Sequence, residues 1–126
     1  MVSDHISDFV TRVRNGYRAN KPSIEAVSTK AVDRFADVLV KAGYLEGYTK
    51  EGVNMTVTLK YNGSKPALSG IKRVSKPGAR IYAGYKDLPR VWGGLGVHVL
   101  STPQGVMTDK DARKLHCGGE LIAQVW

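Results

Sequence analysis

The sequence predicts an α+β fold of two small domains: an N-terminal α-β-α-β-β domain over residues 1–64 and a mainly β C-terminal domain with one short helix over residues 65–126. Two segments in the first half carry apolar residues at helical spacing, and a strictly alternating segment follows them. The second half consists of short β-prone segments separated by Gly and Pro turns. With 126 residues, 42% of them hydrophobic, the chain is long enough for this arrangement.

The first predicted helix covers residues 4–19, with Ser3 and Asp4 as candidate caps. Its apolar face consists of Ile6, Phe9, Val10, Val13 and Tyr17. Pro22 ends this helix, and the alternation around Glu25 predicts a short strand over residues 24–26.

A second helix is predicted after Ser28 or Thr29, either of which has a side chain that can cap it. Its apolar face consists of Val32, Phe35, Ala36, Leu39 and Val40. Gly43 is expected to end this helix in the left-handed conformation.

Residues 55–61 alternate between large apolar and polar side chains, which predicts a strand with one face on a core. Asn62-Gly63 is a strong turn signal after this strand. We expect a linker over residues 64–70, which include Pro66, and we place the domain boundary there.

In the second half, residues 71–75 and 80–83 flank Lys76-Pro77-Gly78, whose order suits a type II turn, so a hairpin is predicted. Gly93-Gly94-Leu95-Gly96 leads into a strand over residues 97–100. A polar loop over residues 101–105 separates this strand from Val106-Met107. Thr108, with Asp111 three residues later, predicts a capped short helix that ends at Gly118-Gly119. Residues 121–126 predict a buried final strand.

The net charge of +8, from 19 basic and 11 acidic residues, favours a polyanionic partner. Residues 1–63 hold nine basic and seven acidic groups, whereas residues 64–126 hold ten and four. A nucleic acid is therefore the leading candidate, and it should meet the second half more closely.

Several function classes lack their required residues. A single cysteine, Cys117, fits a reducing compartment and a cytoplasmic location. No signal peptide or membrane-spanning segment is predicted. The three histidines are scattered, and the sequence contains neither a nucleotide-binding glycine pattern nor a nucleophile motif, so no cofactor, metal site or catalytic residue is expected.

Basic residues and tyrosines interleave in the second half, which is typical of a surface that neutralises phosphates and stacks on bases. They are Lys72, Arg73, Lys76, Arg80, Tyr82, Tyr85, Lys86 and Arg90. The alternative is a solvated charged face with the tyrosines in a core.

Three segments, in this order along the chain, resemble the bacterial ribosomal protein S-eight family of the small subunit. They are Asp4 to Asn15 with its Thr11-Arg12-Val13-Arg14-Asn15 core, Ser75 to Tyr82, and Ser101 to Asp109 followed by Ala112-Arg113 and Gly118-Gly119-Glu120. The resemblance covers essentially the whole chain.

This resemblance implies a non-catalytic constituent of the small ribosomal subunit that binds a helical region in the central domain of small-subunit rRNA. It also implies a monomer in a cytoplasmic or organellar ribosome, next to other small-subunit proteins. The expected RNA-binding residues in the second half are Lys76, Arg80, Tyr82, Ser101, Thr102, Gln104, Gly105, Gly119 and Glu120. Those in the first half are Asp4, Arg12, Arg14, Ser28, Thr29 and Lys30.

The chain departs from the family pattern at Pro103, where serine is usual, and at Gln104, where Lys or Arg is usual. Two other functions stay open at this point. One is a nuclease that uses Asp109, Asp111 and Glu120 as metal ligands, and the other is a module that binds double-stranded DNA.

Overall fold

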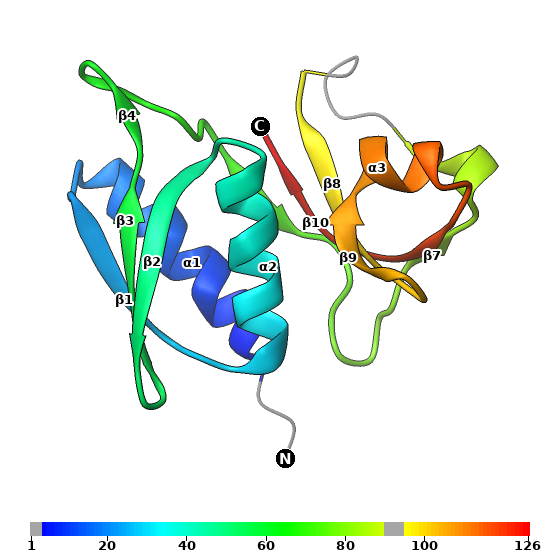
Figure 1. The fold of residues 1–126 in the computed structure, drawn as a ribbon, viewed down its shortest axis with the longest axis horizontal. Coiled ribbons are helices and arrows are strands. Elements are labelled where there is room, and N and C mark those ends of the chain that lie inside the picture. Colours follow the sequence, from blue (N-terminus) through cyan, green and yellow to red (C-terminus); the bar gives the residue numbers. More distant parts are fainter. Residues whose placement is uncertain (1–3, 90–94) are drawn as a thin grey trace. The chain divides into compact units, whose positions relative to one another are not determined.

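The computed structural model describes residues 4–89 and 95–126, and the chain divides into two compact units between Ser69 and Gly70. The predicted α+β fold is confirmed (Figure 1). The first unit contains helices α1 (His5–Arg18) and α2 (Lys30–Lys41). Its strands are β1 (Ser23–Val27), β2 (Leu45–Glu51), β3 (Asn54–Leu59), β4 (Tyr61–Asn62) and β5 (Lys65–Pro66).

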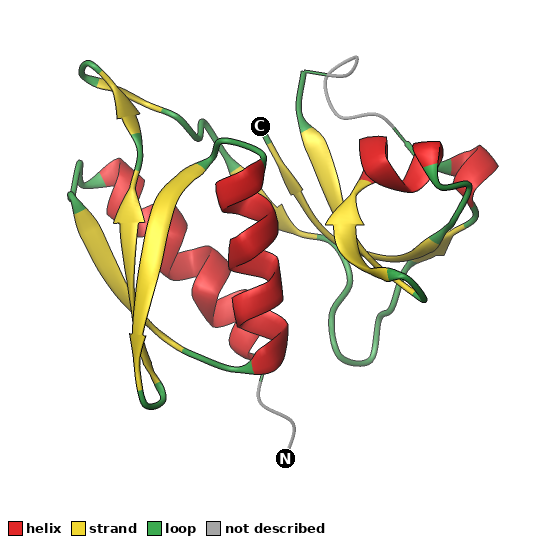
Figure 2. Cartoon of the chain, in the orientation of Figure 1, coloured by secondary structure: helices red, strands yellow, loops and turns green. Residues whose placement is uncertain are grey.

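In the first unit, both helices cover one face of an antiparallel sheet with the strand order β1-β3-β2 (Figure 2). The alternation of buried and exposed residues in β1 and β3 follows the predicted pattern and points the apolar side chains at the helices. Phe9 of α1 and Phe35 of α2 meet edge to face, with ring centroids 5.8 Å apart. Both side chains are almost fully buried, so they form the centre of this core.

The predicted starts of both helices and the predicted end of α2 are confirmed, whereas α1 ends at Arg18, before Pro22. The Asp4 carboxylate accepts a hydrogen bond from the backbone N–H of Ser7 at 3.1 Å, and the Thr29 hydroxyl accepts one from Val32 at 3.2 Å. Gly43 follows α2 with a φ of +89°, the left-handed conformation expected after a helix end.

Three details of the first unit differ from the prediction or were not predicted. The predicted strand over residues 55–61 ends at Leu59, because the backbone N–H of Lys60 donates to the Tyr17 hydroxyl at 3.0 Å. The segment predicted as a linker contains β5, which pairs with β4 and therefore belongs to this unit. The position of β2 was not predicted, because Gly47 and a register shift beside it remove the alternating pattern.

The second unit is a sheet in which the last strand lies at the centre. Its strands are β6 (Ile71–Arg73), β7 (Tyr82–Ala83), β8 (Val97–Thr102), β9 (Gly105–Thr108) and β10 (Gly119–Val125). It also contains a 3₁₀ turn, η1 (Tyr85–Asp87), and a short helix, α3 (Asp109–Lys114). Strand β10 pairs with β6, β7 and β8, and β8 pairs with β9.

The predicted hairpin of residues 71–75 and 80–83 is wrong. The turn itself forms, with Lys76 bridging to Ala79 and Gly78 at a φ of +84°. However, β6 and β7 both pair with β10 and not with each other. The buried Ser75 holds the connection closed, since its hydroxyl donates to the Ile81 carbonyl at 3.1 Å and accepts from the Ile81 N–H at 2.8 Å.

Three boundaries in the second unit also differ. The polar loop predicted over residues 101–105 is only two residues long, because β8 continues to Thr102 and β9 begins at Gly105. Helix α3 ends at Lys114 instead of at Gly118-Gly119, and His116 takes the left-handed conformation with a φ of +54°. The final strand is present but begins earlier, at Gly119. The predicted turn residues Gly93 and Gly94 lie outside the described residues.

Candidate nucleic-acid interface

Three of the expected RNA-binding residues lie in one row across neighbouring strands of the second unit. Glu120 of β10 stands directly opposite Tyr82 of β7 on one side and Ser101 of β8 on the other. Because neighbouring strands are about 4.8 Å apart, the row spans roughly 10 Å. The fold therefore brings together three side chains from segments far apart in the sequence. We call Tyr82, Glu120 and Ser101 the strand row.

The strand row faces away from α3. The next residues along the three strands, Ala83, Leu121 and Leu100, pack with Ala112 of α3 in a hydrophobic cluster. Side chains alternate between the two faces of a strand, so the strand row must lie on the other face. Tyr82 is 67% exposed, so the alternative that places this tyrosine in a core is wrong.

Glu120 is held in place by Arg80. The Arg80 guanidinium lies 3.2 Å from one carboxylate oxygen of Glu120 and 3.4 Å from the other. The Glu120 side chain is only 16% exposed, whereas that of Arg80 is 52% exposed. The ion pair fixes the carboxylate in the middle of the strand row and offsets its negative charge on a surface that should meet phosphates.

Gly118 and Gly119 allow the close approach of the strands beside the row. A side chain on Gly118 would overlap the carbonyl oxygen of Ala83, and one on Gly119 would overlap that of Ser101. Both obstacles are backbone atoms, which cannot turn aside. The Gly-Gly-Glu segment therefore has a structural reason for its two glycines and presents one side chain, Glu120.

The turn between β8 and β9 is held by the Thr102 hydroxyl. It donates to the carbonyl of Gly105 at 2.8 Å and accepts from the N–H of Gln104 at 3.1 Å. Thr102 is 9% exposed, and Gly105 has a φ of +119°. Among these residues, Ser101 and Gln104 present exposed side chains, whereas Thr102 and Gly105 shape the turn.

The remaining basic residues of the second half are divided among several places. Lys76 is exposed at the turn that it forms with Ala79, and Lys72 is exposed on β6. Arg73 is partly buried and donates to the Ile122 carbonyl at 2.8 Å. Arg90 lies outside the described residues.

In the first unit, several expected RNA-binding side chains already have structural partners. Asp4 and Thr29 cap the two helices, and the Ser28 hydroxyl donates to Asp33 at 2.7 Å. Arg12 pairs with Asp8 at 2.9 Å and donates to the Glu25 carbonyl at 3.3 Å. Arg14 is half-buried, whereas Lys30 is exposed in the first turn of α2.

The three carboxylates considered as metal ligands are not brought together. Asp109 is buried, accepts a hydrogen bond from the backbone N–H of His98 at 3.0 Å and pairs with Arg113 at 2.7 Å. It therefore joins α3 to β8. Residues 4–89 and 95–126 contain no group of three His, Cys, Asp or Glu side chains that could hold a metal ion. Over the same residues, the helices are too short or too polar to span a membrane.

A comparison with known families decides the affiliation. The family model described as Ribosomal protein S8 matches residues 4–126. The chain belongs to this ribosomal protein family. It is therefore a structural, non-enzymatic constituent of the small ribosomal subunit, and the nuclease interpretation is wrong.

Individual family members match over nearly their whole length. The chain is 48% identical over 128 residues to the small ribosomal subunit protein uS8 of an Azoarcus species, with 98% of both chains covered. It is 44% identical over 131 residues to the uS8 protein of Solibacter usitatus, with 100% of both covered. It is 42% identical over 132 residues to the uS8c protein of Rhodomonas salina, again with 100% of both covered.

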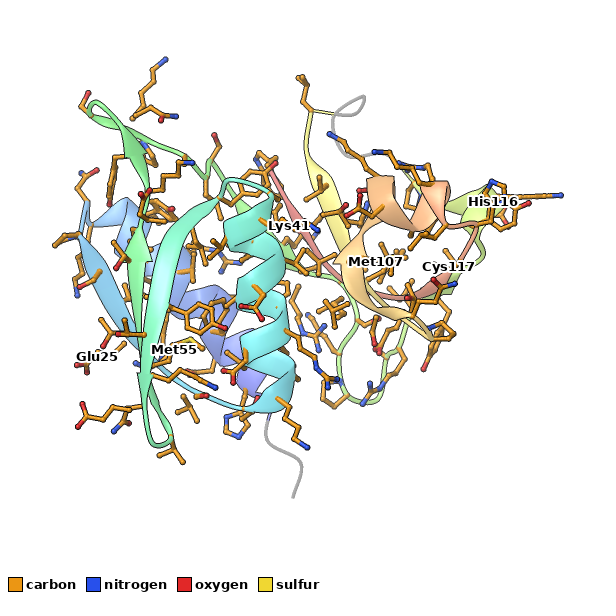
Figure 3. The ribbon with its side chains drawn as sticks, viewed as in Figure 1. Glu25, Lys41, Met55, Met107, His116 and Cys117 are labelled. Carbon is orange, nitrogen blue, oxygen red and sulfur yellow. The ribbon has the colours of Figure 1, made fainter. Side chains whose placement is uncertain are left out.

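Sequence reasoning singled out Tyr85 of the second unit but missed its partner, His116. The rings of Tyr85 and His116 stack at a centroid distance of 5.0 Å with 16° between their planes. His116 lies past the end of α3, at the edge of the unit in Figure 3. A residue in the left-handed conformation commonly follows a helix, and no glycine directly follows α3 to take that conformation. This was the one signal for His116 in the sequence. No sequence pattern links that position to Tyr85.

Proposed function

We propose that this subunit constituent binds a helical region in the central domain of small-subunit rRNA and stabilises its geometry during assembly. The strand row on the exposed face of the second unit supports this proposal most strongly. An aromatic ring, a carboxylate and a hydroxyl lie there within roughly 10 Å, beside the cation Arg80.

This combination suits RNA better than a DNA duplex. The deep major groove of an RNA helix hides its base edges, so proteins read the shallow groove, the 2′-hydroxyls and unpaired bases. Ser101 can donate to or accept from a 2′-hydroxyl or a base edge, and the Tyr82 ring can stack on a base. Glu120 can accept from a base amino group or a 2′-hydroxyl.

The other expected residues of the second unit either hold the backbone of the strand row in place or contribute polar and charged side chains. Thr102, Gly105 and Gly119 keep the backbone in the conformation that presents Ser101 and Glu120. Gln104 is exposed next to Ser101 and contributes a neutral contact where the family usually has a cation. Lys76 and Arg80 neutralise phosphates, and Arg80 also positions Glu120.

The first unit adds contacts to the RNA backbone. Lys30, exposed in the first turn of α2, can neutralise a phosphate, and Arg12 and Arg14 add positive charge along α1. Asp4, Ser28 and Thr29 contribute mainly by fixing the N-terminal ends of the two helices. Other small-subunit proteins are expected as neighbours of a single copy of this chain.

Filter binding of the purified protein to separate transcripts of the small-subunit rRNA domains tests this proposal. We expect selective binding to the central-domain transcript, with an affinity that falls steeply as salt rises because phosphate neutralisation releases counterions. A DNA duplex should compete poorly. Equal affinity for all the rRNA domains, or affinity that does not change with salt, would contradict the proposal.

A further inference from the structure

Tyr85 and His116 form an exposed aromatic surface outside the strand row. We propose that this pair is a second RNA contact, a platform on which one unpaired nucleobase stacks. This inference rests on the RNA binding proposed above and adds a separate site to it. The Tyr85–His116 pair is called the aromatic platform below.

The rings are arranged as a stack and not as a core contact. They lie 5.0 Å apart with nearly parallel planes, and both side chains reach the surface. Tyr85 is 36% exposed, and Leu115 next to His116 is 51% exposed. His116 is exposed, and every nucleobase has a flat face that can continue a stack of rings.

The charge around the aromatic platform suits a nucleotide. The Lys86 ammonium lies 5.9 Å from the centroid of the Tyr85 ring, close enough to be attracted by its face. Lys114 is exposed at the end of α3, two residues before His116, and Asp87 is the acidic residue of η1, next to Lys86. Stacking rings next to ammonium groups match a base that carries its phosphate, whereas a purely apolar partner would gain nothing from the cations.

The fold places the aromatic platform at the end of the ladder that carries the strand row. Tyr82 pairs with Glu120 and Ala83 with Gly119. Gly118 then lies against Gly84, and Tyr85 and His116 meet just beyond. Three residues along an extended chain span about 10 Å, so one RNA segment can reach both surfaces.

The backbone of His116 gives a clean way to remove one ring. His116 has a φ of +54°, which glycine adopts without strain. His116→Gly therefore deletes the imidazole while relieving the backbone, and its melting temperature should equal or exceed that of the parent. Asn20→Gly is the matched control, because Asn20 has the same φ of +54° in the first unit and contributes no ring to the aromatic platform.

The experiment measures the affinity of full-length protein for small-subunit rRNA, together with the melting temperature, for the parent, His116→Gly, Tyr85→Leu, their double variant and Asn20→Gly. We expect each platform variant to bind about 5- to 100-fold more weakly, as for the loss of one stacked base. The double variant should lose little more than either single variant, because the two rings act as one unit. Asn20→Gly should bind like the parent.

The possible failures are distinguishable. If the parent binds the rRNA selectively and His116→Gly binds equally well, the aromatic platform is not an RNA contact, while the proposed function stands. If the variants bind rRNA normally and a reconstitution assay then shows that they enter assembled subunits poorly, the surface meets a protein, which also overturns the inference. If the parent shows no selective binding, both proposals fail.

Discussion

Ser101 and Thr102 are neighbours in the sequence, yet their hydroxyls have different surroundings. Ser101 lies exposed in the strand row, whereas the Thr102 hydroxyl donates to Gly105 and accepts from Gln104 within the turn. We predict that Ser101→Ala weakens RNA binding and leaves the melting temperature nearly unchanged. Thr102→Val should instead lower the free energy of unfolding by about 1–3 kcal/mol, because it leaves two backbone groups without a partner.

Measuring RNA affinity and thermal unfolding for both variants separates these roles. Thr102→Ser is the matched control, since it keeps the hydroxyl and should preserve the turn. Parent-like binding by Ser101→Ala would mean that this segment is only a structural turn.

Gln104 and Pro103 test the departures from the family pattern. Gln104→Lys should tighten RNA binding and steepen its salt dependence, because it adds a phosphate-neutralising charge to an exposed position. Pro103→Ser should lower stability slightly, since proline restricts the unfolded chain, while binding stays equal or becomes tighter. Affinities at two salt concentrations check both expectations. An unchanged salt dependence for Gln104→Lys would place this turn away from phosphates.

His98 predicts how the stability of the second unit depends on pH. Burial lowers the pKa of its imidazole, although Asp109 and the carbonyl of Pro89 oppose this effect. Folded His98 therefore binds its proton at a lower pH than unfolded histidine, whose pKa is about 6.5. The unit should keep its full stability above pH 6.5 and lose stability as the pH falls toward the lowered pKa.

Thermal unfolding between pH 5 and pH 8 measures this effect. His98→Gln should flatten the dependence in that interval, whatever its effect on absolute stability. A slope that is the same in the parent and in His98→Gln would show that another group is responsible.

At the scale of the elements, the packing of β10 between β7 and β8 depends on glycine. A methyl group on Gly119 would overlap the Ser101 carbonyl, so Gly119→Ala must push β8 away from β10. We predict a loss of more than about 2 kcal/mol in the free energy of unfolding, as for an overpacked core. Gly84→Ala is the control, because its added methyl group would lie 4.0 Å from the nearest atom and its φ of −74° suits alanine. Chemical denaturation of both variants checks this, and equal stabilities would contradict it.

The same elements show how far the sequence could predict the fold. The helices were predictable because their apolar faces and caps are local signals. The five apolar residues of α1 lie within that one helix, and Thr29 caps α2 from the position directly before it. The pairing of β6 and β7 was not predictable, because it depends on β10, which follows only after β8, β9 and α3, and on the side chain of Ser75. Likewise, the family resemblance gave the members of the strand row, but only the register of three strands places them side by side.

At the scale of the molecule, the positive charge and most of the proposed RNA-binding residues lie in the same half. Residues 64–126 hold ten basic and four acidic groups, and they include the whole strand row. We predict that a fragment of residues 66–126 retains most of the selectivity for central-domain rRNA, with a weaker overall affinity. Filter binding of the fragment and of the full chain to cognate and control RNA helices measures this. A folded fragment without preference for the cognate RNA would contradict it.

The most direct test of the account is a photochemical cross-link from the strand row to rRNA. Benzoylphenylalanine in place of Tyr82 keeps an aromatic ring at a side chain that is 67% exposed. The control carries it in place of Thr56, exposed on the face of the first sheet that the helices do not cover. After irradiation with small-subunit rRNA, the position-82 probe should give a cross-link confined to one site in the central domain, and the position-56 probe none. A cross-link from position 56 with none from position 82 would contradict the claim that the strand row recognises the RNA.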